Sequence, residues 1–240
     1  MGEIKTMEGF GLPGAGKSTC IAALKKDTRK PESLQILVRK EGDSKFLDIP
    51  NPQSSKKRQN LLEIYLSLAY LLSRPAFFIL VIRSMIIFKL GKNFLSVLRS
   101  LIIALYTRSK LKVENTEGDI LLDEGLVQFI GSLVVESNRN KQLPKQLIKY
   151  VLSNYIQALI YFDVDFDDAI IRIKKRNDGK SRFDKMNNEN AILNLRKMQK
   201  TFTICINEAK NLNIPVLELK RGNSINENAE LTLSFLKELQ

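Results

Sequence analysis

The sequence contains no histidine among its 240 residues, and this absence excludes several classes of chemistry. There can be no histidine-activated nucleophile, no histidine general base and no histidine metal ligand, so a bound metal ion must rest on oxygen ligands. Cysteine is almost as scarce, because Cys20 and Cys205 are the only two. Two cysteines provide neither a disulfide framework nor the spacing of a zinc site, and they favour a reducing, cytoplasmic location.

Acidic residues are nearly missing from about a quarter of the chain. Residues 54–112 contain eleven Lys and Arg residues and one acid, Glu63, and so carry ten of the twelve net positive charges. The most apolar stretch, 76–88, is interrupted by Arg83 and is shorter than the ~20 residues that span a bilayer. We expect the segment to be helical, to be divided at Pro75 and to meet something anionic, either a bound molecule or a membrane surface.

A glycine-rich turn, GLPGAGKS, follows a short strand-like run and precedes apolar residues at helical spacing. This strand, turn and helix context is the one that a phosphate-binding P-loop requires. The backbone N–H groups and the positive end of the helix dipole bind phosphate, Lys17 adds a mobile charge, and the Ser18 hydroxyl is a ligand for Mg²⁺. The expected nucleotide contacts are Gly11, Pro13, Gly14, Ala15, Gly16, Lys17, Ser18 and Thr19.

Two adjacent acids end the aliphatic run 119–123. Asp123 has the position of a Walker B carboxylate, which faces the P-loop and holds Mg²⁺ directly or through water. Glu124 has two interpretations, which the sequence leaves open. It is either the general base that polarises an acceptor hydroxyl, or a residue that caps the following helix.

Apolar runs that fit buried strands alternate with helical patterns along the whole chain. The runs lie at 4–10, 33–39, 119–123, 159–163 and 215–219. This alternation predicts one α/β domain over 1–240, a three-layer P-loop NTPase fold with a parallel sheet of about five strands and a site at its carboxyl edge. The segment at about 54–112 is expected to be a helical insertion, and the polar segment at about 176–188 a lid.

Basic residues gather where the helix after the fourth strand ends. Arg172 and Arg176 are four positions apart and share one helical face, and Arg182 lies in the predicted lid. In phosphoryl transfer such arginines neutralise charge on the transferring group while a loop excludes water. The alternative is a basic helix face that only contacts solvent.

The combined pattern of GLPGAGKST, ILLDEG and YFDVDFDDAIIRIKKR with SRFD resembles the thymidylate kinase and nucleoside monophosphate kinase branch of P-loop proteins. It is also similar to the kinase-like proteins of bacterial polysaccharide gene clusters. The resemblance implies that Arg172, Arg176 and Arg182 approach the phosphates and that the region between the second and third strands binds the acceptor. The chain departs from the thymidylate kinases inside the P-loop and at Glu124, where that family has the arginine of an Asp-Arg pair.

We therefore expect a kinase that transfers the γ-phosphoryl group of ATP, with Mg²⁺, to a nucleoside, nucleotide or sugar-type acceptor. Its expected catalytic residues are Lys17, Glu124, Arg172, Arg176 and Arg182, and its metal ligands Ser18 and Asp123. The alternative is a membrane-surface or partner-binding P-loop ATPase without small-molecule kinase activity. A GTPase is disfavoured because no Asn-Lys-x-Asp motif is present, and nucleic-acid binding because aromatic residues do not alternate with the basic ones. Peripheral membrane contact through 54–112 and a homodimer are left open.

Overall fold

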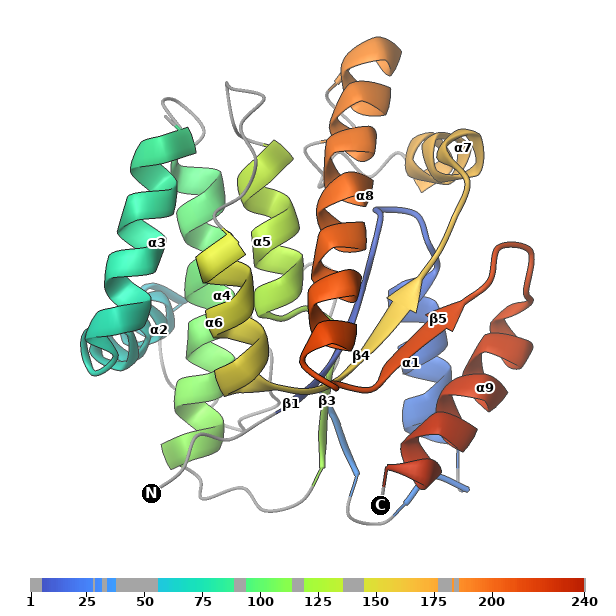
Figure 1. The fold of residues 1–240 in the computed structure, drawn as a ribbon, viewed down its shortest axis with the longest axis horizontal. Coiled ribbons are helices and arrows are strands. Elements are labelled where there is room, and N and C mark those ends of the chain that lie inside the picture. The colour runs from blue at the N-terminus through green and yellow to red at the C-terminus, as the bar shows by residue number, and fades with distance from the viewer. Residues whose placement is uncertain are drawn as a thin grey trace.

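The computed structural model describes residues 6–27, 29–31, 34–37, 56–88, 94–113, 119–135, 145–176, 183 and 186–239. Within these residues one sheet contains five strands in the order β2-β3-β1-β4-β5 (Figure 1). They are β1 (Thr6–Gly11), β2 (Gln35–Leu37), β3 (Ile120–Leu122), β4 (Ile156–Phe162) and β5 (Val216–Leu219). Every pairing between them is parallel, which confirms the predicted α/β class.

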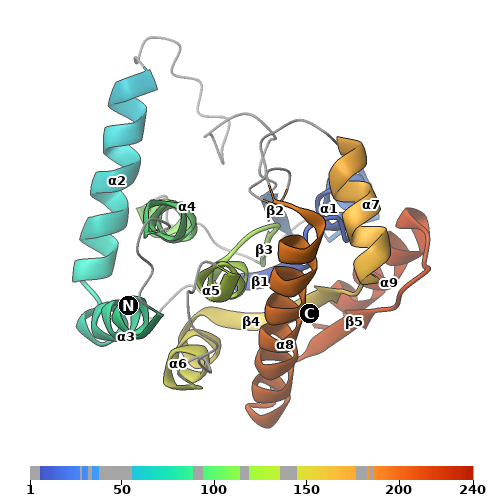
Figure 2. The same cartoon turned by 90° about the horizontal axis from the view of Figure 1, so that it is seen from above.

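Helices cover both faces of the sheet. They are α1 (Lys17–Lys26), α2 (Lys56–Leu72), α3 (Pro75–Phe88), α4 (Phe94–Val113), α5 (Leu126–Val135), α6 (Lys145–Tyr155), α7 (Phe166–Arg176), α8 (Asn188–Asn211) and α9 (Ile225–Glu238). Figure 2 shows α1 and α9 on one face and α5, α6 and α8 on the other, in agreement with their contacts to the strands. The predicted three layers are therefore present.

The central strands are continuous apolar runs because both of their faces are covered. All three residues of β3 have no exposed surface, and β4 is buried except at Gln157. The edge strand β5 is only partly buried. β1 departs from this pattern, because Glu8 lies in its middle with no exposed surface.

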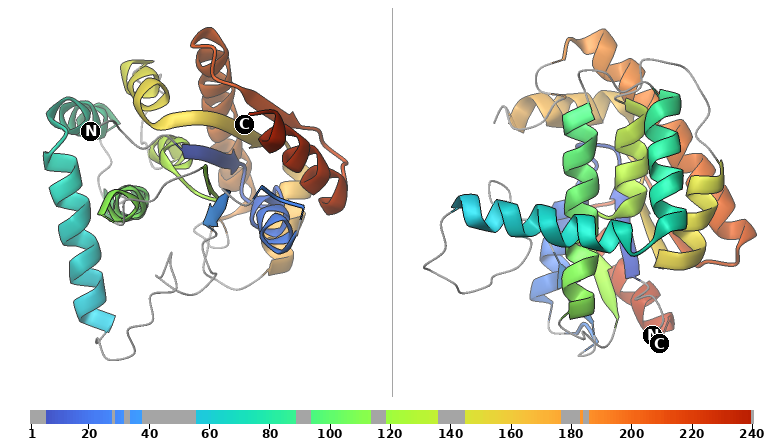
Figure 3. Two further views of the ribbon diagram at one scale, coloured as in Figure 1. Left: turned by 90° about the horizontal axis from the view of Figure 1, so that it is seen from below. Right: turned by 90° about the vertical axis from the view of Figure 1, so that its left-hand side faces the viewer.

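Three helices follow β2 and form a further layer outside α5 and α6. Pro75 separates α2 from α3, as expected, and is the first residue of α3, where a missing N–H does no harm. α2 crosses α4 (Figure 3), and the Ser67 hydroxyl donates to the Ile102 carbonyl of α4 at 2.9 Å. α3 packs on α6, with the rings of Phe77 and Tyr150 stacked at 5.9 Å.

Among the described residues, a bilayer span is not offered by any single helix. The part of α2 from Ile64 to Leu72 and the whole of α3 have sufficient combined length and apolar character, but the chain bends by 109° between them. This bent pair coincides with the stretch that the sequence marks as both apolar and basic.

Candidate active site

The glycine-rich turn lies at the carboxyl end of β1, at the centre of the sheet. Gly14 and Gly16 have φ angles of 84° and 82°, a left-handed conformation that side chains with a Cβ disfavour. A Cβ on Gly14 would lie 2.8 Å from the Ala169 carbonyl oxygen, so α7 packs directly on the turn. Gly16 is the N-cap of α1 and has no side chain to occupy the first N–H groups of that helix. The turn therefore has the form of an anion site.

Lys17 and Asp123 meet within this turn. The Lys17 Nζ donates to Asp123 Oδ1 at 2.8 Å, and the two residues are 8% and 1% exposed. The contact arises because Lys17 follows β1, Asp123 follows β3, and these strands are neighbours whose carboxyl ends share one edge. The structure thus brings the predicted Walker B acid onto the P-loop.

The residues at this edge suit Mg²⁺, which binds oxygen ligands and commonly keeps phosphate oxygens and water among them. Ser18 and Thr19 are exposed at the start of α1, beside the Lys17–Asp123 contact. The Ser18 hydroxyl and the Asp123 carboxylate would be the protein ligands. Across the described ranges, the acids and cysteines form no group of three or more that could hold a metal ion by themselves.

Glu8 holds the turn that carries Asp123. Its carboxylate accepts the N–H groups of Leu126 at 3.0 Å and Val127 at 2.9 Å, which begin α5. Gly125 lies against the same carboxylate, and a Cβ there would collide with it. Residues 123–125 are thereby tied to β1. Glu8 was not among the residues predicted from the sequence, although an acid inside an apolar run marks an unusual position.

This arrangement bears on the two interpretations of Glu124. Glu124 is partly buried in the turn between β3 and α5. The N–H groups of Leu126 and Val127, which a capping residue would accept, are already bonded to Glu8. Both interpretations of Glu124, as a general base and as a helix cap, stay predictions.

Arg108 of α4 completes the buried cluster around Glu8. Its Nη2 donates to Glu8 Oε1 at 2.6 Å and to the Thr6 hydroxyl at 2.8 Å. The guanidinium also lies 5.0 Å from the centre of the Tyr155 ring. One of the eleven basic residues of 54–112 is therefore internal, and the anion that it meets belongs to the protein itself. For Arg108, the expected anionic partner is therefore Glu8 and not a bound molecule or a membrane surface.

The structure describes the side chain of one of the three predicted arginines. Arg172 of α7 donates from Nη1 to the Gly14 carbonyl at 3.3 Å, so its guanidinium lies against the P-loop. Arg176 is the last residue of α7, and its side chain lies outside the described part of the structure. Arg182 lies outside the described residues altogether. α7 thus brings one of the three arginines to the phosphate-binding turn.

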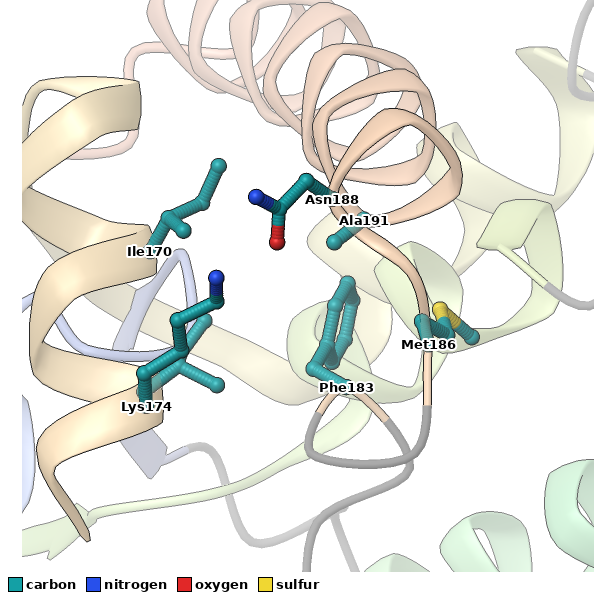
Figure 4. A pocket seen from close by; sticks show the side chains of 7 residues that line it. Ile170, Lys174, Phe183, Met186, Asn188 and Ala191 are labelled. Atoms are coloured by element: carbon teal, nitrogen blue, oxygen red, sulfur yellow. The ribbon is translucent and has the colours of Figure 1, made fainter. Parts of the chain in front are cut away.

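The opposite side of α7 borders a pocket of about 300 Å³ (Figure 4). It is lined by Ile170, Ile173, Lys174, Phe183, Met186, Asn188 and Ala191. Phe183 belongs to the predicted lid and is only 3% exposed. The Phe183 side chain therefore lies between α8 and α7, the helix that also carries Arg172.

A second polar cluster joins the ends of β4 and β5. Arg221 donates to Asp163 at 2.7 Å and to Asp165 at 3.0 Å, and the Tyr161 hydroxyl donates to Asp163 at 3.4 Å. Burial raises the pKa of Tyr161 well above its usual value, and the Asp163 charge adds to this shift. The hydrogen bond to Asp163 also raises the pKa of Arg221. Arg221 could not be predicted from the sequence, because its partners lie 56 and 58 positions away.

Comparisons with known proteins identify the fold. No protein-family model and no curated protein matches the chain. Among solved structures, it is similar to the deoxyadenosine kinase from M. mycoides with bound dATP, with a TM-score of 0.53 and 19% identity over 97% of this chain and 99% of that one. The same enzyme with the products dCMP and a flexible dCDP bound gives a TM-score of 0.53 and 18% identity, with equal coverage. The chain therefore shares its fold with that enzyme, and the narrower resemblance to thymidylate kinases stays a prediction.

Proposed function

We propose that the protein is a kinase that transfers the γ-phosphoryl group of ATP, with Mg²⁺, to a nucleoside or a related small acceptor. The observation that carries the proposal is the 2.8 Å contact between Lys17 Nζ and Asp123 Oδ1 inside a glycine turn. A phosphate held by the turn and a metal ion held by the carboxylate would be neighbours there. Phosphoryl transfer depends on this arrangement, because it is catalysed mainly by positioning and charge neutralisation.

The phosphate-binding residues follow from the geometry of the turn. The backbone N–H groups and the first turn of α1 bind the β- and γ-phosphates, and Lys17 neutralises their charge. Mg²⁺, when bound to Ser18 and Asp123, polarises the phosphate oxygens. Arg172 is exposed and donates to a carbonyl of the turn at 3.3 Å, so its guanidinium is within reach of the γ-phosphate.

The remaining roles concern the acceptor and the closing of the site. Glu124, next to Asp123, accepts the proton of the acceptor hydroxyl. Arg176 and Arg182, at the end of α7 and in the predicted lid, add positive charge to the transferring group when the lid closes.

The acceptor class that we place first is a nucleoside. The two similar structures are of a deoxyadenosine kinase, and the likeness spans nearly the full length of both chains. Nucleoside monophosphates and simple sugars are the other acceptors to compare, because the sequence resembles nucleotide kinases and the proteins of polysaccharide clusters.

The test is ADP formation by the purified protein with ATP, Mg²⁺ and a panel of deoxynucleosides, nucleosides, nucleoside monophosphates and sugars. Lys17→Ala should lower the rate by roughly 100-fold or more, because it removes a preorganised charge from the transferring phosphate. Lys200→Ala, which changes an exposed lysine on α8, is the matched control and should leave the rate unchanged.

An unchanged rate in a folded Lys17→Ala variant would refute the assignment of the P-loop. If the wild-type protein binds ATP but no acceptor of the panel raises ADP formation, the kinase proposal loses its support. The ATPase alternative would then be favoured.

A further inference from the structure

The outer faces of α2 and α3 present a concentration of apolar side chains to solvent. Exposed fractions reach 68% at Tyr65, 64% at Leu72 and 69% at Ile86. We call the whole set the α2–α3 face: Ile64, Tyr65, Leu68, Leu72, Ile79, Ile82 and Ile86. Elsewhere in the described ranges, the exposed large apolar residues are spread singly over α7, α8 and α9. A cluster of this kind indicates a binding surface, whereas scattered residues do not.

The opposite sides of these two helices are already packed against the protein. α2 contacts α4 through the hydrogen bond from Ser67 to the Ile102 carbonyl, and α3 buries Phe77 and Val81 against the core. Both helices are therefore apolar on an inner and an outer side. A helix that is apolar all round is normally covered all round, so the α2–α3 face calls for a partner.

The charge of this part of the chain decides between a second copy and a lipid surface. The sequence has no Asp or Glu in the fifty residues from Ile64 to Val113, while Arg74 and Arg83 flank the apolar positions. Two copies joined through this face would bring together two basic segments in which Glu63 of α2 is the only acid. Anionic headgroups supply the missing negative charge.

We propose that the α2–α3 face docks the protein on an anionic lipid surface. The apolar side chains enter the boundary between headgroups and acyl chains, Tyr65 lies at headgroup level, and the basic residues contact the phosphates. Two helix axes that meet at one bend define a plane, so both helices can lie along one flat surface. Figure 2 shows α2 and α3 on the side of the molecule opposite α7 and α9, so the helix that carries Arg172 faces away from the membrane. The proposal does not depend on the kinase reaction.

The test is flotation of the full-length protein with vesicles of phosphatidylcholine alone and of phosphatidylcholine mixed with phosphatidylserine. We expect binding to the mixed vesicles only, weakened by added salt. Ile79→Ser/Ile86→Ser should reduce binding by about tenfold or more, because two largely exposed apolar side chains no longer enter the lipid. The matched control, Leu193→Ser/Leu231→Ser, removes exposed apolar residues from α8 and α9 and should bind as the wild type does.

Arg83→Glu tests the charge without touching the apolar positions. Arg83 is exposed and donates to Gln146 of α6 at 3.3 Å, so the variant should fold and should bind the mixed vesicles more weakly. Circular dichroism and ATP binding verify the fold of each variant. Failure of the wild type to float, or equal flotation with phosphatidylcholine alone, would overturn the proposal. So would light scattering that finds a wild-type dimer and an Ile79→Ser/Ile86→Ser monomer, since the face would then belong to a second copy.

Discussion

Replacing Arg108 tests whether the buried ion pair beneath the site supports the fold. Arg108 and Glu8 are 2.6 Å apart, and their side chains are 2% and 0% exposed. The chain offers a matched pair, because Lys210 and Glu218 have the same 2.6 Å separation with side chains 56% and 47% exposed. The two pairs have the same separation, but the buried pair also includes the Thr6 hydroxyl and the Tyr155 ring, so the comparison sets a buried network against a single exposed ion pair.

Arg108→Met leaves the Glu8 carboxylate inside the protein without its counter-ion. Removing one partner of a buried pair lowers the free energy of unfolding by about 3–5 kcal/mol. For a chain of this length, that corresponds to a fall in Tm of roughly 6 to 20 °C. Lys210→Met removes a partner that water can replace, so its effect should stay below about 1 kcal/mol.

Urea unfolding followed by circular dichroism measures both variants against the wild type. The double variant Glu8→Gln/Arg108→Met should be more stable than Arg108→Met alone, because it leaves no buried charge uncompensated. The reasoning fails if Arg108→Met costs no more stability than Lys210→Met. It also fails if Glu8→Gln lowers the free energy of unfolding as much in the Arg108→Met variant as it does in the wild type.

Two further predictions concern the P-loop and its helix. Gly14→Ala should weaken ATP binding and lower Tm more than Gly222→Ala does. Both glycines have a positive φ, but a Cβ at Gly14 would also lie 2.8 Å from the Ala169 carbonyl oxygen, whereas a Cβ at Gly222 would meet nothing. Isothermal titration and thermal unfolding measure the two effects, and equal losses in the two variants would contradict the prediction. Burial raises the pKa of the Cys20 thiol from 9.0 to about 11, so its folded form holds the proton more tightly than its unfolded form. The protonated Cys20 thiol therefore contributes to the free energy of unfolding below pH 9, and this contribution is lost as the pH rises towards 11. Urea unfolding at pH 9 and at pH 11 should show a larger loss of stability in the wild type than in Cys20→Ala.

The elements that sequence predicts well are those whose chemistry is local. The strand at 119–123 was found as Ile120–Leu122 and the one at 215–219 as Val216–Leu219, because buried parallel strands are short continuous apolar runs. β4 begins three residues earlier than expected, since α6 runs into it without a loop, and α6 itself was not predicted. The strand order could not be predicted, because it depends on how the chain crosses between strands.

The candidate site likewise contains residues that belong to local sequence patterns and residues that depend on distant contacts. Lys17 and Asp123 belong to patterns that can be recognised within a few residues, and their meeting follows once their strands are known to be neighbours. Glu8 could not be interpreted in this way, because its burial makes sense only beside Arg108, 100 positions away in the chain. Buried charges are stable when paired, and the partner of such a charge can come from any element.

The contacts around β1 also explain how segments that are distant in the chain are held in fixed positions at one site. Arg172 and the backbone of Ala169 hold α7 on Gly14, so a movement of α7 would press on the glycine-rich turn. On the other side, Arg108 holds α4 on Glu8, and Glu8 in turn holds the start of α5 and the turn that carries Asp123. Lys17 and Asp123 are therefore positioned by two independent sets of contacts. One set comes from α7, and the other comes from α4 through Glu8. A change confined to either set should displace one partner relative to the other, and this is why residues that never touch the nucleotide belong to the description of the site.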